Sequence, residues 1–293
     1  MSRAGFVALA GRPNVGKSTF LNAVVGGKLA IVSDRPQTTR RAIRGIVRSG
    51  ETQLVLVDLP GVQRPQDALT ERMAARVQHE LSGADAALLM LNGEQGVGPG
   101  DRFIAHQLIG GGLPVTIAVN KIDRLREGAL LEALSAVEAL ALDAEVFPIS
   151  ARRGTGVAAL VEHLAAQMPP GPFLFEDDAR SDQPREQLLA ELIREAVIRR
   201  TFKEVPHAVE VVIDEIESPR AGLERVRALI WVESESQKAI LIGAGGRMIK
   251  AIGSAARREL ERELGCRVFL ELSVRVRRGW RGDDALLDRI GIT

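Results

Sequence analysis

Eight consecutive residues near the N-terminus have the types and spacing needed to bind a phosphate chain. Residues 11–18 fit the pattern G-x-x-x-x-G-K-[ST] after an apolar run and before a predicted helix over 19–25. Glycines let backbone N–H groups wrap around phosphate, and the N-terminus of the helix adds partial positive charge. Lys17 supplies a point charge, and the Ser18 hydroxyl can bind Mg²⁺. We therefore predict nucleotide contacts from Gly11, Arg12, Pro13, Asn14, Val15, Gly16, Lys17, Ser18 and Thr19.

A second segment ends a buried apolar run with a carboxylate. Asp58 is followed by Leu59, Pro60 and Gly61, a composition that also occurs at ordinary strand-to-turn exits. In a nucleotide site, a carboxylate at this point orients Mg²⁺ through water, and the Gly61 N–H can meet the γ-phosphate. We predict that all four residues contact the nucleotide and that Asp58 belongs to the metal site.

Between these segments, residues 32–41 contain few apolar side chains and end before a predicted strand. This composition suits a switch that becomes ordered with a triphosphate and loosens after hydrolysis. Within Gln37-Thr38-Thr39-Arg40-Arg41, a threonine should close over Mg²⁺ and the γ-phosphate, and we favour Thr39 over Thr38. The predicted metal site is Ser18, Thr39 and Asp58, and the predicted catalytic groups are Lys17, Thr39 and Gly61.

A third segment, Asn120-Lys121-Ile122-Asp123, ends another apolar run and indicates which base is bound. The Asp123 carboxylate can accept two hydrogen bonds, from N1–H and the exocyclic amine of guanine, a pair that adenine cannot supply. A site built on such bonds rejects the analogue that lacks them by about 10⁴-fold or more. Backbone at Ala151, after the last predicted strand, can contact the guanine carbonyl oxygen. We predict contacts to GTP or GDP from Asn120, Lys121, Asp123, Ser150 and Ala151.

The elements that must position these segments belong to one fold class. Six short apolar runs predict strands, at residues 6–10, 43–47, 53–57, 86–91, 115–119 and 146–149. Several are apolar throughout, as expected for parallel strands buried on both faces. Helical patterns such as those over 69–81 and 130–142 lie between them. The alternation predicts a doubly wound α/β domain over residues 1–168.

Residues 169–183 form the predicted linker. The prolines and glycine at 169–172 and the acidic, polar stretch over 176–183 cannot continue a helix or build a core. Over residues 184–293 the predicted order changes to helix, strand, strand, short helix, glycine turn, helix and strand. In the last strand, over 267–276, apolar and charged residues alternate, with Phe269 as the exception on the charged face. This pattern predicts an antiparallel α+β sheet packed on helices.

Charge is unevenly distributed along the chain. The net formal charge is +1, but residues 238–281 contain eleven Lys or Arg and four Glu or Asp, a net of +7, so the remainder carries −6. Such a basic segment on a slightly acidic protein indicates a polyanionic partner near the C-terminus, although a solvated helix face has the same composition. Tyrosine is absent and aromatic residues make up 3%, which argues against a sugar-binding or multi-base stacking surface.

Together these motifs resemble the translation-factor-like GTPases, and more closely the Era family. The resemblance is carried by residues 11–19, by Gln-Thr-Thr-Arg at 37–40, Asp-Leu-Pro-Gly at 58–61, Asn-Lys-Ile-Asp at 120–123 and Ser-Ala at 150–151. It extends from Gly5 to the C-terminus and includes the helix around residues 191–195 after the linker. It implies a P-loop NTPase fold with a doubly wound, mostly parallel sheet, followed by an α+β type II KH domain.

The KH resemblance centres on a Gly-x-x-Gly turn. A backbone-rich turn between two helices can approach a sugar-phosphate strand closely, and the strand then lies in a groove beside the sheet edge. KH turns often carry Lys or Arg between the glycines, whereas this turn has Ala and Gly, so neighbouring cations must supply the charge. The predicted RNA contacts are Gly243, Ala244, Gly245, Gly246, Arg247, Lys250, Arg257 and Arg258. The resemblance implies the 3′ end of small-subunit ribosomal RNA as partner and a role in small-subunit assembly.

The residue after the second motif bears on hydrolysis. In Ras-like enzymes, a glutamine directly after Asp-x-x-Gly orients the attacking water. Here Val62 fills that position and Gln63 follows it, and the Era family shares this hydrophobic replacement. Because an apolar side chain cannot orient water, we expect slow intrinsic GTP hydrolysis that is helped by switch backbone or by a partner.

Two other interpretations stay open from the sequence. One is an RNA-binding assembly factor whose nucleotide domain acts mainly as a sensor. The other is a membrane-associated regulatory GTPase whose basic segment contacts anionic lipid; peripheral membrane contact is associated with the family, but no lipidation signal is present. The sequence has no run of 18 apolar residues and no signal peptide. We therefore expect a cytoplasmic monomer, with the inner face of the cell membrane as the alternative location.

Overall fold

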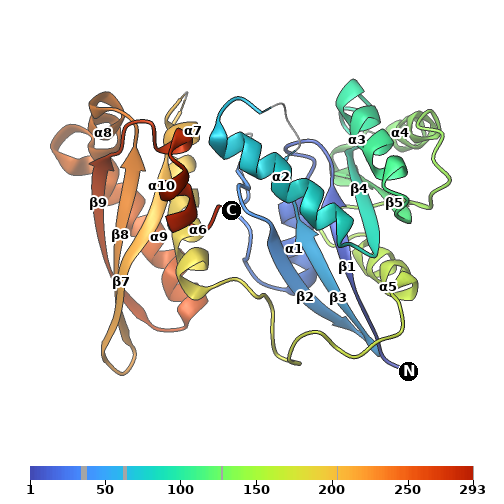
Figure 1. Ribbon diagram of the computed structural model, residues 1–293, viewed down its shortest axis with the longest axis horizontal. Coiled ribbons are helices and arrows are strands. Elements are labelled where there is room, and N and C mark those ends of the chain that lie inside the picture. Colours follow the sequence, from blue (N-terminus) through green and yellow to red (C-terminus); the bar gives the residue numbers. More distant parts are fainter. Residues whose placement is uncertain (34–37, 62–64, 127, 203, 293) are drawn as a thin grey trace. The chain divides into compact units, whose positions relative to one another are not determined.

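The computed structural model describes residues 1–293 except 34–37, 62–64, 127, 203 and 293. The chain forms two compact units, unit 1 built mainly from residues 1–182 and unit 2 built mainly from residues 183–292 (Figure 1). Each unit has its own hydrophobic core, as expected for a chain of this length.

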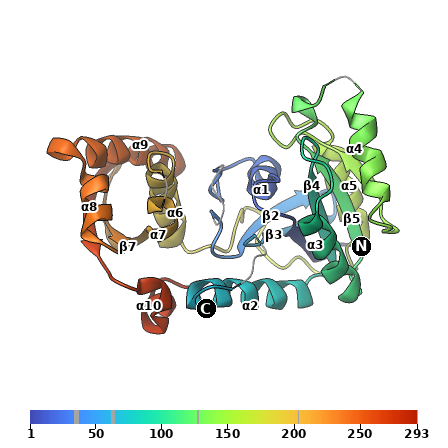
Figure 2. The same cartoon turned by 90° about the horizontal axis from the view of Figure 1, so that it is seen from above.

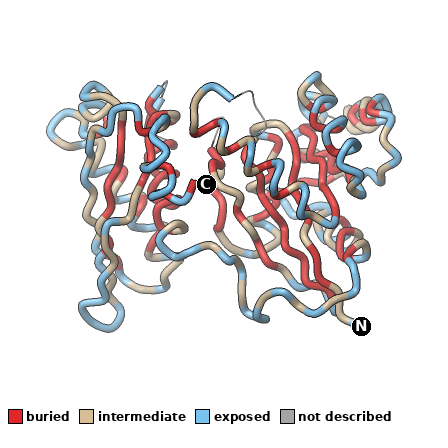
Figure 3. The backbone as a smooth tube through the Cα atoms, in the orientation of Figure 1, coloured by how far each residue is buried: buried red, intermediate tan, exposed pale blue. Residues whose placement is uncertain are grey.

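Unit 1 is built on a six-stranded sheet with the order β2-β3-β1-β4-β5-β6. β2 is antiparallel to β3, and every other neighbouring pair is parallel. β3 and β4 are buried at every position, which is what strands covered on both faces require, and the central strands are red in Figure 3. The mostly parallel sheet is confirmed, with strands β1 (Arg3–Ala10), β2 (Ile43–Ser49), β3 (Thr52–Asp58), β4 (Ala86–Asn92), β5 (Val115–Asn120) and β6 (Val146–Pro148).

Helices cover both faces of this sheet (Figure 2). α1 (Lys17–Val25) and α5 (Val157–Gln167) pack on one face, whereas α2 (Ala68–Ser82), α3 (Pro99–Gly110) and α4 (Ala129–Glu138) pack on the other. The helix predicted over 130–142 is wrong at its end. The chain leaves α4 after residue 138 and turns at residue 141, where φ is 52°, because it must reach the start of β6.

Unit 2 contains a three-stranded sheet with the order β7-β8-β9. Its strands are β7 (Glu210–Arg220), β8 (Leu223–Val232) and β9 (Arg267–Val276), and α6 (Arg185–Ile198) and α9 (Arg247–Leu264) cover one face. The other elements are α7 (Val205–Ala208), α8 (Glu235–Ile242), η2 (Ala244–Gly246), η3 (Trp280–Gly282) and α10 (Asp284–Arg289). Across the described part of the chain, no single helix has the length and apolar composition to cross a membrane; α8 with the following η2–α9 segment reaches both, but the pair is bent by 40°.

The predicted antiparallel sheet is wrong for one of its two strand pairs. β7 and β8 are antiparallel, but β8 and β9 are parallel. The reason is that the chain between β8 and β9 forms α8 and α9, a crossover long enough to return it to the start of β8. The predicted alternation in β9 is confirmed, since Val268 is buried and Phe269 is 51% exposed.

Residues 173–182, which we call the strap, lie along β3 and the edge strand β2 in unit 1. Buried Gln53 donates from Nε2 to the Phe175 carbonyl at 2.9 Å, and its Oε1 accepts the N–H groups of Leu174 at 2.7 Å and Phe175 at 3.0 Å. The Ile46 N–H donates to the carbonyl of Arg180 at 2.9 Å. The strap forms no helix, as its composition predicts, yet these bonds fix its backbone on the sheet.

Candidate functional site

The loop from Gly11 to Ser18 connects β1 to α1 and has a backbone that side chains other than glycine rarely allow. Gly11 and Gly16 have φ values of 147° and 109°, and Asn14 has a φ of 64°. A Cβ at Gly11 would lie 2.5 Å from the carbonyl oxygen of Met90, so glycine is required there. The loop runs directly into the N-terminus of α1, where unpaired N–H groups favour an anion.

Lys17 is buried inside this loop. Its Nζ donates to the carbonyl oxygens of Gly11 at 3.0 Å and Arg12 at 3.3 Å. Burial lowers the pKa of the Lys17 ammonium, and the Asp58 carboxylate opposes that shift. Burial likewise raises the pKa of Asp58, opposed by Lys17 and by hydrogen bonds from hydroxyl groups. Both charged forms are therefore unfavourable in the protein alone, and a phosphate chain with a cation would stabilise them.

Three oxygen-bearing side chains converge beside Lys17. The Ser18 hydroxyl donates to Asp58 Oδ2 at 2.6 Å and lies 3.3 Å from Thr39 Oγ1, which is itself 3.4 Å from Asp58 Oδ2. Among the described residues, no group hydrogen-bonds to Asp58 Oδ1, although that atom is buried. This donor set fits Mg²⁺, which prefers oxygen ligands, needs few carboxylates and keeps several waters.

The segment after β3 passes close to the phosphate loop. Leu59 and Pro60 are buried, and a Cβ at Gly61 would lie 2.9 Å from Pro13 Cγ. Gly61 therefore packs against Pro13 of the phosphate loop at a distance that only glycine permits without displacing the proline. The predicted switch residue Gln37, and Val62 and Gln63 of the hydrolysis argument, lie outside the described residues.

Asn120 joins two loops of the site. It ends β5, its Nδ2 donates to the Val15 carbonyl at 2.8 Å, and its Oδ1 accepts the Ala151 N–H at 3.0 Å. Both bonds are buried, so the side chain is occupied in holding the phosphate loop against the loop that carries Ser150 and Ala151. Lys121 then has a φ of 67° and turns the chain into η1 (Ile122–Arg124).

Asp123 carries the carboxylate predicted to read guanine. Its Oδ1 accepts a hydrogen bond from the Ser150 hydroxyl at 2.7 Å, and its Oδ2 lies 3.9 Å from Arg153 Nε. The Ser150 hydrogen bond is the main cause that holds the pKa of Asp123 below its ordinary value, with Arg153 and Arg124 contributing by charge. The carboxylate is therefore ionised at neutral pH and can accept two N–H groups from a base.

Arg12 forms an ion pair with Asp101 that was not predicted from the sequence. Its Nε lies 2.9 Å from Asp101 Oδ1, and its Nη2 donates to the Gly96 carbonyl at 3.4 Å. Asp101 is fully buried and its Oδ2 also accepts the N–H of Gly98 at the start of α3. The Arg12 side chain is thus anchored on α3. An acidic residue three positions after Gly98, with a proline between them, is a helix-start signal that could have indicated Asp101.

Unit 2 contains a groove beside the predicted KH turn. The groove has a volume of about 330 Å³ and lies between α9 and β9, with Lys250, Gly253 and Arg257 from the helix and Phe269 and Leu272 from the strand among its lining residues. Its α9 wall was predicted from the basic residues. A sheet edge was predicted as the other wall, and β9 is an edge strand, but its lining residues were not predicted, although the exposed position of Phe269 in the alternating strand was a signal for them.

The turn itself has the geometry that glycine requires. Gly243, Gly245 and Gly246 have φ values of 70°, 59° and 75°, and a Cβ at Gly243 would lie 2.8 Å from Met248 Cβ. Arg247 folds back on the turn, with its Nε donating to the Ala244 carbonyl at 3.2 Å. Of the other predicted cations, Lys250 and Arg257 line the groove, whereas Arg258 is exposed on α9 outside its lining.

Comparison with known proteins identifies the families that the two units resemble. A family model described as a 50S ribosome-binding GTPase matches residues 6–121, and a KH domain model matches residues 204–281. GTPase Era of Mycobacterium tuberculosis (strain ATCC 25618 / H37Rv) is 44% identical over 295 residues, covering 98% of each chain. GTPase Era of Mycobacterium sp. (strain JLS) is 43% identical over 295 residues, covering 99% of this chain and 98% of the relative. The chain belongs to the Era family of GTPases.

Solved Era structures share the fold of this Era-family GTPase over its full length. The crystal structure of Era in complex with MgGDPNP and nucleotides 1506–1542 of 16S ribosomal RNA has a TM-score of 0.95 and 34% identity, covering 100% of both chains. An Aquifex aeolicus Era variant bound to GDP and AlF₄⁻ has a TM-score of 0.94 and 34% identity, covering 99% of both. The predicted family and the predicted fold, a P-loop GTPase sheet followed by a KH domain, are confirmed.

Proposed function

We propose that this Era-family GTPase binds and hydrolyses GTP in unit 1, binds the 3′ end of small-subunit ribosomal RNA in unit 2, and assists assembly of the small ribosomal subunit. The observation that carries the proposal is the similarity of the whole chain to an Era structure that holds MgGDPNP and 16S ribosomal RNA nucleotides. The buried ammonium, the ionised carboxylate of Asp123 and the basic groove support the same function from the residues themselves.

The nucleotide contacts follow from the chemistry of each group. Backbone N–H groups of residues 11–19, apart from Pro13, which has none, would surround the phosphates, and the Lys17 ammonium would stabilise their negative charge. Ser18, Thr39 and Asp58 would hold Mg²⁺, which when bound neutralises charge on the phosphate oxygens. Asp123 accepts the two guanine N–H groups, while Asn120 positions the loops on either side.

Hydrolysis requires positioning and charge stabilisation more than covalent chemistry. Water attacks the γ-phosphorus in line with the bond to GDP, and GDP and phosphate are the products. Lys17, the loop N–H groups and the Gly61 N–H stabilise the charge on the γ-phosphoryl oxygens, and Thr39 closes the site from the switch side. Because Val62 stands where Ras-like enzymes have glutamine, we propose that intrinsic turnover is slow.

The RNA strand would lie in the groove between α9 and β9. The Gly243–Gly246 turn offers backbone to the sugar-phosphate chain, and Arg247 supports the turn through its bond to the Ala244 carbonyl. Lys250 and Arg257 contribute charge from the groove lining. Phosphate contacts release counterions, so the affinity for RNA should fall steeply as salt increases.

The domain limits we propose are 1–168 for the GTPase domain, 169–183 for the connection and 184–293 for the KH domain. The bonds of the strap to Gln53 and Ile46 support a connection that is held on the first domain. We propose a cytoplasmic monomer that contacts the small ribosomal subunit; peripheral contact with the inner face of the cell membrane is the alternative location.

The test in cells is cross-linking of bound RNA followed by sequencing. Enrichment of the 3′ end of the small-subunit RNA is expected, and recovery of random RNA would contradict the proposed partner. Steady-state GTPase rates with and without that RNA separate a hydrolysing switch from a nucleotide sensor, because a sensor would show negligible turnover in both.

The test of the groove is the salt dependence of RNA affinity. Lys250→Ala and Arg257→Ala should each weaken binding and reduce the slope of log affinity against log salt by about 1. Arg262→Ala is the matched control, since Arg262 lies on the same helix, is paired with Glu259 and is absent from the groove lining. An equal loss in all three variants would indicate a general effect of charge and would contradict the placement of the RNA in the groove.

A further inference from the structure

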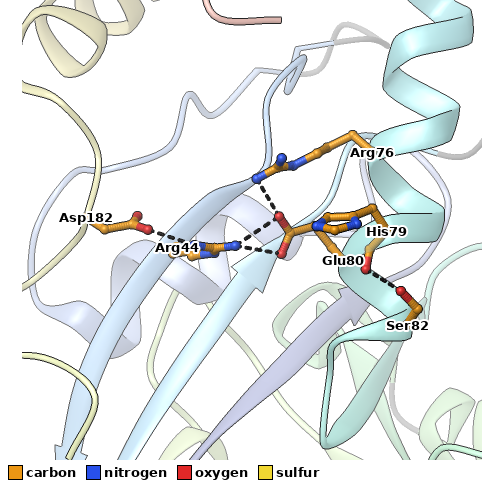
Figure 4. Close-up of polar contacts among 6 residues, drawn as sticks. All are labelled: Arg44, Arg76, His79, Glu80, Ser82 and Asp182. Carbon is orange, nitrogen blue, oxygen red and sulfur yellow. Dashed lines mark hydrogen bonds and ion pairs between the residues drawn. The ribbon is translucent and has the colours of Figure 1, made fainter. Parts of the chain in front are cut away.

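Arg44 on β2 connects three segments of unit 1 (Figure 4). Its Nη2 lies 3.1 Å and 3.2 Å from the two carboxylate oxygens of Glu80 on α2, and its Nη1 lies 3.0 Å from Asp182 Oδ2 at the end of the strap. Arg76, one turn earlier on α2, places its Nη2 2.6 Å from Glu80 Oε1. We call Arg44, Arg76, Glu80 and Asp182 the hub.

Several contacts fix the positions of Glu80 and Arg44 in the hub. The Glu80 side chain is 5% exposed and faces two guanidinium groups, so the loss of either would leave a buried carboxylate with less compensation. The Arg44 guanidinium also lies 5.6 Å from the centre of the Phe6 ring. The Arg44 carbonyl accepts the Ser181 hydroxyl at 2.6 Å, which adds a second tie between the strap and the same residue.

The elements that meet in the hub follow both candidate switch segments. β2 begins directly after the segment that carries Thr39, and α2 begins after the segment that carries Gly61. In GTPases these segments order around the γ-phosphate and release after hydrolysis. The strap ends at Asp182 and continues through the chain into α6, which begins at Arg185.

We propose that the hub couples the nucleotide state of unit 1 to the strap, and through the chain to the first helix of unit 2. A shift of α2 relative to β2 would strain one of the two Arg44 contacts, because one guanidinium holds Glu80 with one nitrogen and Asp182 with the other. The nucleotide state therefore sets how firmly the end of the strap is held. The inference rests on the proposed nucleotide switch and does not require the proposed RNA.

The test is hydrogen exchange of backbone amides in the strap, measured on the full chain with GDP and with a non-hydrolysable GTP analogue. In the unaltered protein, exchange over residues 173–182 should differ between the two nucleotides by about fivefold or more, the lower end of typical coupling between sites. Arg44→Gln should reduce that difference to nearly none. Asp182→Asn, which leaves the buried Glu80 fully paired, should do the same and guards against misfolding of the first variant.

Arg48→Gln is the matched control. Arg48 lies on the same strand and pairs with Asp177 of the same strap at 3.0 Å, and its guanidinium lies 4.6 Å from the centre of the Phe173 ring. Its ion pair and its ring contact are therefore with the strap rather than with α2. This variant should keep the nucleotide-dependent difference. The proposal is overturned if the unaltered protein shows the same exchange with both nucleotides, if Arg44→Gln and Asp182→Asn keep the difference, or if Arg48→Gln abolishes it equally. Since the assay contains no RNA, failure of the RNA proposal would leave its result unaffected.

Discussion

Substitution of Asn120 by alanine should weaken nucleotide binding although the side chain is already occupied within the protein. Asn120→Ala removes the donor to the Val15 carbonyl at 2.8 Å and the acceptor of the Ala151 N–H at 3.0 Å, and both bonds are buried. A buried backbone group that loses its partner costs about 1–3 kcal/mol, so the two groups together cost about 2–6 kcal/mol. If water enters and recovers part of this, a cost of about 2 kcal/mol remains. This would be a loss of affinity of about 30-fold if all of it fell on nucleotide binding, and the part that falls on the stability of the nucleotide-free protein reduces that factor.

The assay is titration with a fluorescent GDP analogue, together with urea unfolding of the nucleotide-free protein. The total loss of free energy should divide between weaker GDP binding and lower stability to urea, because Asn120 holds the loops both with and without nucleotide. Asn92→Ala is the control: Asn92 is aligned with Asn120 on the neighbouring strand β4, and its side-chain Oδ1 accepts the Glu94 N–H at 3.0 Å. It should lose about 1 kcal/mol of stability and keep its GDP affinity. The reasoning is refuted if Asn120→Ala retains both the affinity and the stability of the unaltered protein, or if Asn92→Ala loses as much affinity.

Three further predictions concern single groups of the site. The Ser150 bond depresses the pKa of Asp123, so the ionised carboxylate stabilises the fold and the guanine complex at neutral pH, and this stabilisation is lost as pH falls through the lowered pKa. Ser150→Ala should therefore raise the pKa of Asp123 toward the ordinary value of an aspartate, as followed by carboxyl-carbon NMR. Asp58→Asn should make release of a GTP analogue nearly independent of Mg²⁺, and release that still accelerates in EDTA would contradict the metal assignment. Gly61→Ala places a Cβ 2.9 Å from Pro13 Cγ, so affinity for a GTP analogue should fall by about tenfold while affinity for GDP is kept, and an equal loss for both would contradict γ-phosphate contact.

Local patterns predicted which segments form strands. Apolar runs predicted the six strands of unit 1, of which β3 and β4 are buried at every residue. The bounds of β9 were predicted to the residue, since its apolar and charged positions follow the strand period. The direction in which β9 pairs could not be predicted, because alternation within a strand is the same for parallel and antiparallel neighbours.

The residues of the candidate site also differ in how far the sequence predicts them. Gly11, Lys17 and Ser18 are contiguous in the chain, and their chemistry depends on local backbone geometry, so their spacing was informative. The bond between Arg12 and Asp101 joins residues on separate elements, and no local pattern in the sequence connects them.

The sequence by itself determined the phosphate loop, the guanine-reading carboxylate, the basic segment and the resemblance to the Era family. Each of these depends on residue types that lie close together in the sequence, so it can be recognised without knowledge of the fold. Only the tertiary structure decided which side chains hold those motifs together: Asn120 between two loops, Gln53 under the strap, and Arg44 between β2, α2 and Asp182. The physical reason is that hydrogen bonds and ion pairs depend on distances of about 3 Å between atoms, and such distances between remote residues exist only after the chain has folded.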